Sequence, residues 1–170
     1  NLTLFEIVEQ VMMAKRQLNP DQRITNIVFM GMGEPMENLT AVLQSLEILT
    51  HERGLKISKN RITVSTCGLV PQMLEFGTHH AAKLAISLSA TTDELRNVLV
   101  PVNKRYPLKT LMDACRNYSL PNRGRITFEY VVLDEVNDGL DDAKRMVQLL
   151  EGIPSKINLI PFNEFPESGL

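Results

Sequence analysis

The sequence contains little cysteine, and its cysteines stand far apart. Cys67 and Cys115 are the two cysteines among 170 residues. Two widely separated cysteines indicate neither the clustered ligands of a zinc site nor a disulfide framework. We therefore expect no metal ligands in this chain, and a protein whose thiols are reduced.

Long apolar runs and an excess of basic residues are also missing. No stretch approaches the roughly 20 apolar residues of a membrane-spanning helix, and no charged segment followed by an apolar one opens the chain. These absences predict a cytoplasmic protein without membrane contact. The net charge of -2 excludes an overall basic field of the kind that attracts nucleic acid. An RNA partner would therefore need a local patch or a further part of the protein.

Hydrophobic residues, at 44% of the chain, are sufficient for one domain with its own core. Their periodicity predicts strands at residues 24–30, 61–68, 83–89, 125–133 and 156–163. Helical spacing predicts helices at residues 3–18, 38–51, 70–76, 92–98, 108–118 and 140–150. Strands that alternate with helices pair in parallel through right-handed crossovers. Since no predicted strand has the pattern of a sheet edge, the predicted fold class is α/β, an incomplete TIM-like (β/α) barrel of parallel strands.

One stretch marks the point where hydrophobic residues give way to ligand chemistry. The apolar run at residues 27–30 has no polar face, which predicts a strand buried on both sides. Gly31 and Gly33 then allow a sharp turn and a close approach to a ligand, and Glu34 supplies an anionic acceptor. Because the carboxyl ends of parallel strands carry the binding site, we predict a ligand at this edge.

Each predicted strand ends at small polar residues. Taken together these are Gly31, Gly33, Glu34, Ser65, Thr66, Ser87, Ser89, Asp134 and Asn163. Acceptors for an ammonium and donors for a carboxylate or ribose suit an amino-acid-bearing nucleotide better than a polyphosphate. The Walker lysine and the Gly-x-Gly-x-x-Gly loop are absent, which disfavours a nicotinamide dehydrogenase. Three alternatives remain open: a plain strand-to-helix turn for the glycines, helix caps for the hydroxyl residues, and a turn for Asn163.

Six motifs carry a resemblance to a known family. They are Gly-Met-Gly-Glu-Pro-x-x-Asn (31–38), Val-Ser-Thr-Cys-Gly (64–68), Leu-Ala-Ile-Ser-Leu-Ser-Ala (84–90), Val-Pro-Val-Asn-Lys (100–104), Val-Asn-Asp (136–138) and Asn-Leu-Ile-Pro-Phe-Asn-x-Phe-Pro (158–166). In this order and spacing, the chain resembles the radical S-adenosylmethionine (radical SAM) RNA methyltransferases. Within that family it resembles the dual-specificity enzymes that methylate C2 of adenine in 23S rRNA and in tRNA.

The resemblance implies a partial radical SAM catalytic domain over residues 1–170, with S-adenosylmethionine and a [4Fe-4S] cluster as cofactors. The implied reaction starts with reductive cleavage of S-adenosylmethionine and passes through a methylated cysteine of the enzyme. Carried over motif by motif, the cofactor-binding residues are Gly33, Glu34, Ser65, Ser87, Leu88, Ser89 and Asn163. Glu34 would meet the ammonium of the methionine end, the serines the carboxylate and ribose, and Asn163 the nucleoside. Cys67 and Ser89 stand where the family often has serine and histidine.

The family's Cys-x-x-x-Cys-x-x-Cys cluster loop is absent from this sequence. We therefore expect a fragment of a longer protein, with the cluster ligands before Asn1 and the methyl-carrying cysteine after Leu170. No catalytic residue or metal ligand is expected within the fragment, which should be inactive alone. The implied partners are 23S rRNA, tRNA and a reducing protein such as flavodoxin, and the implied state is a monomer. The alternatives are a homologous C8-adenine rRNA methyltransferase, another radical SAM enzyme, and a non-catalytic nucleotide-binding α/β module.

Overall fold

The computed structural model describes residues 1–163, in which five strands alternate with helices. The strands are β1 (Ile27–Phe29), β2 (Ile62–Thr66), β3 (Lys83–Ser87), β4 (Ile126–Val132) and β5 (Ser155–Pro161). The α-helices are α1 (Leu4–Arg16), α2 (Leu39–Thr50), α3 (Val70–His79), α4 (Asp93–Leu99), α5 (Leu108–Arg116) and α6 (Leu140–Leu149). Short 3₁₀ helices are η1 (Pro35–Asn38), η2 (Lys59–Arg61) and η3 (Pro101–Lys104). Among the described residues, no helix is long and apolar enough to cross a membrane.

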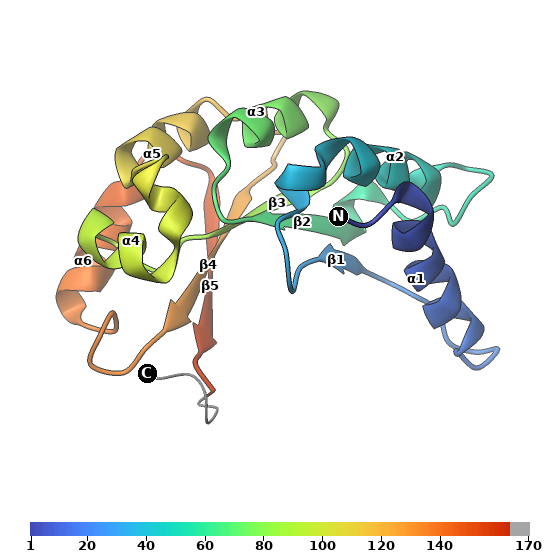
Figure 1. Cartoon of the computed structure of the whole chain (residues 1–170), viewed down its shortest axis with the longest axis horizontal. Helices are drawn as coiled ribbons and strands as arrows, with labels where there is room; N and C mark the ends of the chain where they lie inside the picture. Colours follow the sequence, from blue (N-terminus) through green and yellow to red (C-terminus); the bar gives the residue numbers. More distant parts are fainter. Residues whose placement is uncertain (164–170) are drawn as a thin grey trace.

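All five strands are parallel and pair in chain order, from β1 to β5. A doubly wound sheet would reverse its strand order and carry helices on both faces. Here the sheet curves like an arch, with α2 to α6 on its convex side and the opening of the arch facing away from them (Figure 1). This arrangement is part of a (β/α) barrel and confirms the predicted fold class.

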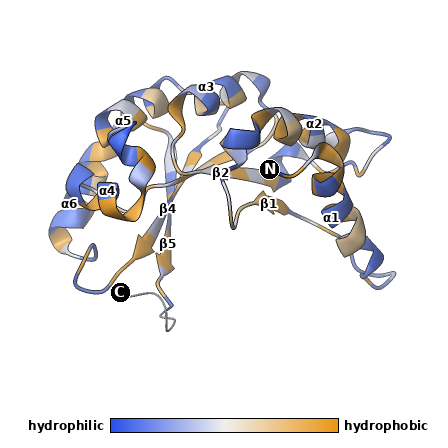
Figure 2. Ribbon diagram, viewed as in Figure 1, coloured by the Kyte–Doolittle hydropathy of each residue, from blue (hydrophilic) through white to orange (hydrophobic). Residues whose placement is uncertain are grey.

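The hydrophobic core lies between the convex face of the sheet and the helices. Alternate strand residues point to this side, and Ile62, Val64, Ile86 and Phe128 are fully buried there. They belong to one cluster with helix residues such as Phe76. Figure 2 shows hydrophobic and hydrophilic residues alternating along the covering helices, as expected for helices with one face on a sheet.

The register of the strands assigns the intervening residues to the concave face. Ser65 pairs with Ala85, Ser87 pairs with Glu129, and Glu129 pairs with Asn158 of β5. Paired residues of parallel strands point to the same side of the sheet. Hydroxyl, carboxylate and amide groups therefore gather on the concave side, towards the carboxyl ends of the strands.

The prediction of a strand at residues 27–30 that is buried on both sides is wrong. β1 has three residues and lies at the edge of the sheet, and the residues Val28 and Met30 are 58% and 43% exposed. An apolar run shows that neither face carries polar groups, but it does not show how many neighbours the strand has. Within the described residues, the outer edges of β1 and β5 are unpaired, so the barrel is incomplete.

A glycine inside α3 makes a testable contribution to this packing. A Cβ at Gly77 would lie 2.8 Å from Cε2 of Tyr118. Replacing an interior helix glycine by alanine normally stabilises a protein by about 1 kcal/mol. Because of the clash, we expect Gly77→Ala instead to lower the free energy of unfolding by about 1–3 kcal/mol in urea titrations.

The control is the same change in a Tyr118→Ala background, where the ring is absent. There, Gly77→Ala should stabilise the fold relative to the Tyr118→Ala single variant. An equal loss of stability in both backgrounds would contradict the packing described for α3.

Candidate functional site

The two predicted glycines lie in the turn that follows β1. Gly31 and Gly33 have φ angles of 121° and 95°, a region that residues with a side chain rarely adopt. A Cβ at either position would meet no atom within 4 Å. Backbone conformation, rather than crowding, therefore requires glycine at both positions of this exposed turn.

Glu34 joins the turn after β1 to the turn after β2. Its Oε1 accepts a hydrogen bond from the backbone N–H of Met36 at 2.9 Å, which caps η1. Its Oε2 accepts one from the backbone N–H of Cys67 at 2.7 Å. A carboxylate has about four lone-pair directions, so acceptor capacity remains for a ligand ammonium.

Ser65 and Thr66 separate into two roles. The Oγ1 atom of Thr66 accepts from the backbone N–H groups of Gly68 and Leu69, at 3.1 and 3.4 Å, and so binds the turn before α3. The N-cap of α3 is Leu69, without a side-chain hydrogen bond, so the cap alternative is wrong for Thr66. Ser65 lies on the concave face and is half-buried. The structure therefore places the Ser65 hydroxyl, and not that of Thr66, on the side open to a ligand.

The segment Ser87–Ser89 continues from the end of β3. Ser87 and Ser89 are half-buried, and Leu88 between them is fully buried. Ser89 has a φ angle of 53°, a left-handed conformation that costs a non-glycine residue roughly 1 kcal/mol. Two serines with one anchored leucine between them thus stand at the edge where the ligand was predicted.

Cys67 follows β2 and does not have the character of a nucleophile. Burial, reinforced by the nearby Glu34 carboxylate, raises the pKa of its thiol to about 12. Cys115 is 1% exposed on α5, and burial likewise raises its thiol pKa to about 12. Both cysteines are therefore protonated packing residues at neutral pH.

Asp134 and Asn163 complete the predicted set at the far strands. Both are exposed, Asp134 in the turn after β4 and Asn163 two residues after β5 ends. Residues 164–166 of the last motif lie outside the described residues. The predicted residues thus occupy one edge of the sheet. Hydrogen bonds join Glu34 to Cys67, Arg96 joins Cys67 to Ser87, and Asn137 binds Ser89.

Arg96 and Glu129 belong to this edge and were missed from the sequence. Arg96, on α4, is fully buried, and burial lowers its pKa to about 10, so that it stays cationic at neutral pH. Glu129 lies beside Ser87 on the concave face, and burial raises the pKa of its carboxyl. The hydrophobic pattern did not reveal either position, because charged residues are mostly exposed and a charged residue in the sequence is therefore predicted to lie at the surface.

A hollow of about 670 Å³ adjoins one part of the site. It lies between α1 and the exposed side of β1 and reaches Gly33 and Glu34, but none of the serines. Its lining is largely apolar, with Ile7, Val11 and Val28 among the residues. The hollow therefore extends the site only at its Glu34 end, and the concave face carries the rest.

The residues present do not fit an iron–sulfur cluster. Within residues 1–163, no three His, Cys, Asp or Glu side chains come together as a metal site would need. Cys115 faces the core and Cys67 the edge, whereas iron–sulfur sites are held by clustered cysteine thiolates. The hydroxyl and carboxylate groups at the edge are suited instead to an amino acid or a ribose.

Comparisons with known proteins agree on one family. The model of the radical SAM superfamily matches residues 3–150. The dual-specificity RNA methyltransferase RlmN of Geobacter sulfurreducens is 58% identical over 96% of this chain and 44% of its own length. That of Syntrophobacter fumaroxidans is 52% identical over 99% of this chain and 49% of its own length. The chain thus spans about half the length of these relatives.

A solved structure supports the same assignment. The crystal structure of a radical SAM methyltransferase from Sphaerobacter thermophilus is 44% identical and superposes with a TM-score of 0.93. The match covers 99% of this chain and 50% of that one. From the curved parallel sheet, the polar carboxyl edge and the match over residues 3–150, we conclude that this chain belongs to the radical SAM superfamily.

Proposed function

We propose that this chain is the S-adenosylmethionine-binding part of a radical SAM methyltransferase that methylates C2 of adenine in 23S rRNA and tRNA through a methylated cysteine. The observation that carries the proposal is the edge that joins Glu34, Ser65 and the Ser87–Ser89 segment. The names of the relatives support RNA methylation. The C2 position comes from the sequence resemblance.

In this proposal each group at the edge has a part in holding the cofactor. Glu34 accepts the ammonium of the methionine end with the lone pairs left by Met36 and Cys67. The hydroxyls of Ser65 and Ser87 form hydrogen bonds with the carboxylate and the ribose. The carboxylate accepts hydrogen bonds, and the ribose hydroxyls can donate or accept them. Bound S-adenosylmethionine supplies the methyl group and the radical precursor of the reaction.

The proposed activity also needs an iron–sulfur cluster, RNA substrates and a reducing partner. The cluster needs a set of neighbouring cysteines, which Cys67 and Cys115 do not provide. The proposal includes 23S rRNA and tRNA as substrates, a reducing partner such as flavodoxin, a monomeric state and a cytoplasmic location. In this proposal, S-adenosylmethionine binds at the polar concave face of the sheet.

The assignment of Glu34 can be tested by removing its charge. Glu34→Gln keeps the size of the side chain and one oxygen acceptor. It removes the negative charge that attracts an ammonium, and its NH₂ group replaces one of the two oxygens that accept from Met36 and Cys67. A hydrogen bond to a charged group is worth about 1.5–3 kcal/mol, so the dissociation constant of S-adenosylmethionine should rise roughly 10- to 150-fold. Isothermal titration calorimetry on the 170-residue chain measures this change.

Glu37→Gln is the matched control, since Glu37 is an exposed acid in the 3₁₀ helix that Glu34 caps. It removes the same charge three residues away and should leave the affinity within twofold of the original. Equal dissociation constants for the original chain and Glu34→Gln would remove Glu34 from the binding site.

The assignment of Cys67 as a packing residue gives a second test. The backbone of Cys67 donates to Glu34 and accepts from Arg96, and a serine hydroxyl can replace the thiol as the side-chain hydrogen-bond partner of Glu34. Cys67→Ser should therefore leave S-adenosylmethionine affinity within about twofold.

The thiol of Cys67 can also be tested by its rate of alkylation. With a thiol pKa of about 12, its thiolate fraction at pH 8 is roughly a thousandfold below that of a free cysteine. Iodoacetamide should therefore label Cys67 far more slowly in the folded chain than in the unfolded chain. Rapid labelling, or loss of binding in Cys67→Ser, would show a functional thiol.

A further inference from the structure

The Ser87–Ser89 segment has an irregular backbone that needs support from outside itself. The N–H groups of Leu88 and Ser89 both donate to the carbonyl of Glu129, at 2.9 and 3.4 Å. Ser89 is in the left-handed region, with φ at 53°. A residue in such an unfavourable backbone conformation stays in it only if contacts with the surrounding structure hold it there.

Arg96 binds the carbonyl groups on one side of this segment. Its Nε donates to the Leu88 carbonyl at 3.0 Å, and one terminal nitrogen donates to the carbonyls of Ser87 and Cys67 at 2.9 and 2.8 Å. The guanidinium is planar, so one side chain fixes three carbonyls in a common geometry. Arg96 thus joins the turn after β2 to the turn after β3.

Asn103 orients this buried guanidinium. Its Oδ1 accepts from Arg96 at 2.9 Å, and its amide nitrogen donates to Asp93 and Asn97 at 2.8 and 2.9 Å. A buried cation is costly unless hydrogen bonds surround it, and this chain of contacts leads from Arg96 to the Asp93 carboxylate. The motif at residues 100–104 therefore supports Arg96 rather than the ligand directly.

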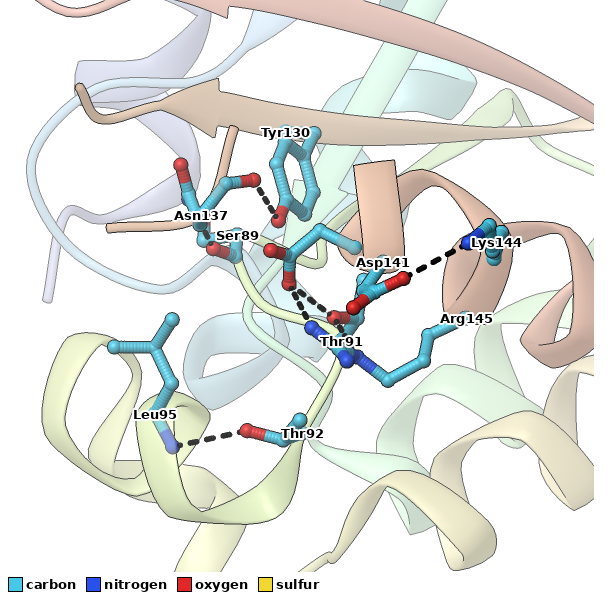
Figure 3. A network of polar contacts seen from close by, with 10 residues as sticks. Ser89, Thr91, Thr92, Leu95, Tyr130, Asn137, Asp141, Lys144 and Arg145 are labelled. Carbon is cyan, nitrogen blue, oxygen red and sulfur yellow. Dashed lines mark hydrogen bonds and ion pairs between the residues drawn. The ribbon is translucent and has the colours of Figure 1, made fainter. Parts of the chain in front are cut away.

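Asn137 binds the other end of the segment. Its amide nitrogen donates to the carbonyls of Ser89 and Val131, both at 2.8 Å, and its Oδ1 accepts from the Leu133 N–H at 2.7 Å. The Tyr130 hydroxyl donates to the Asn137 carbonyl at 2.8 Å. Figure 3 shows Asn137 next to Ser89, with the Tyr130 hydroxyl bonded to it. The motif at residues 136–138 thus holds the same segment from β4.

Three consecutive carbonyls, those of Ser87, Leu88 and Ser89, are therefore bound by two buried side chains from different elements. We propose that Arg96 and Asn137 are positioning residues that fix the Ser87–Ser89 segment for S-adenosylmethionine without touching it. This inference rests on the proposed function. Because these two side chains bind the backbone carbonyls, the half-buried residues Ser87 and Ser89 keep a fixed place at the edge where we propose that the ligand binds.

The test measures affinity and stability separately in the 170-residue chain. Arg96→Lys keeps the charge but cannot hold three carbonyls in one plane, and Asn137→Ala removes the bond to Ser89. Calorimetry should show S-adenosylmethionine binding weakened about tenfold in each variant, with circular dichroism confirming the fold at the same temperature. Asn137→Ala decides the matter if Arg96→Lys does not fold.

Two controls separate positioning from general destabilisation. Arg116→Lys makes the same substitution at an arginine that also donates to carbonyls, those of Leu149 and Glu151, away from the segment. Leu46→Ala empties a fully packed site on α2 and should cost stability of about 2–5 kcal/mol. Both should bind S-adenosylmethionine like the original chain wherever they are folded.

The outcomes are distinct. If folded Arg96→Lys and Asn137→Ala bind as tightly as the original chain, the positioning role is overturned and the proposed function stands. If Leu46→Ala loses affinity as much as they do, the effect is one of stability and the positioning role is again overturned. If the original chain does not bind S-adenosylmethionine, the proposed function fails and the inference fails with it.

Discussion

The structure depends on hydrogen bonds that cross between the turns at the carboxyl edge of the sheet. Parallel strands hold one another through their ladders, but the turns beyond them have no ladder. Here side chains take over: Glu34 binds the Cys67 backbone, Arg96 binds Cys67, Ser87 and Leu88, and Asn137 binds Ser89. Side chains of the chain itself thereby connect the edge from β1 to β4.

The fold was largely predictable because the period of the hydrophobic residues changes regularly along the chain. The order of strands and helices follows from that pattern, as does the barrel-like winding. The burial of β1 was not predictable, because Val28 and Met30 would read the same way in the middle of a sheet. Neighbours across a sheet come from distant sequence, and a local pattern does not contain them.

The site was predictable in its location and less so in its construction. Small polar residues after each strand indicated the edge, and Gly33, Glu34 and the serines lie there. The buried role of Arg96 was hidden, since an arginine on a short helix normally faces water. The motifs that contain Asn103 and Asn137 were the available signal, and their side chains serve the backbone of the site. Glu34 also has a structural part that its sequence position did not reveal.

The central claim is that hydrogen bonds within this chain fix the edge, and amide hydrogen exchange followed by NMR tests it most directly. In the ligand-free chain, the amides of Cys67 and Leu88 should exchange orders of magnitude more slowly than those of the exposed turn at residues 31–33, because each donates to a fixed acceptor in the described structure. Exchange of Cys67 and Leu88 at the rate of that exposed turn would contradict the claim, because it would show that these hydrogen bonds do not hold the edge.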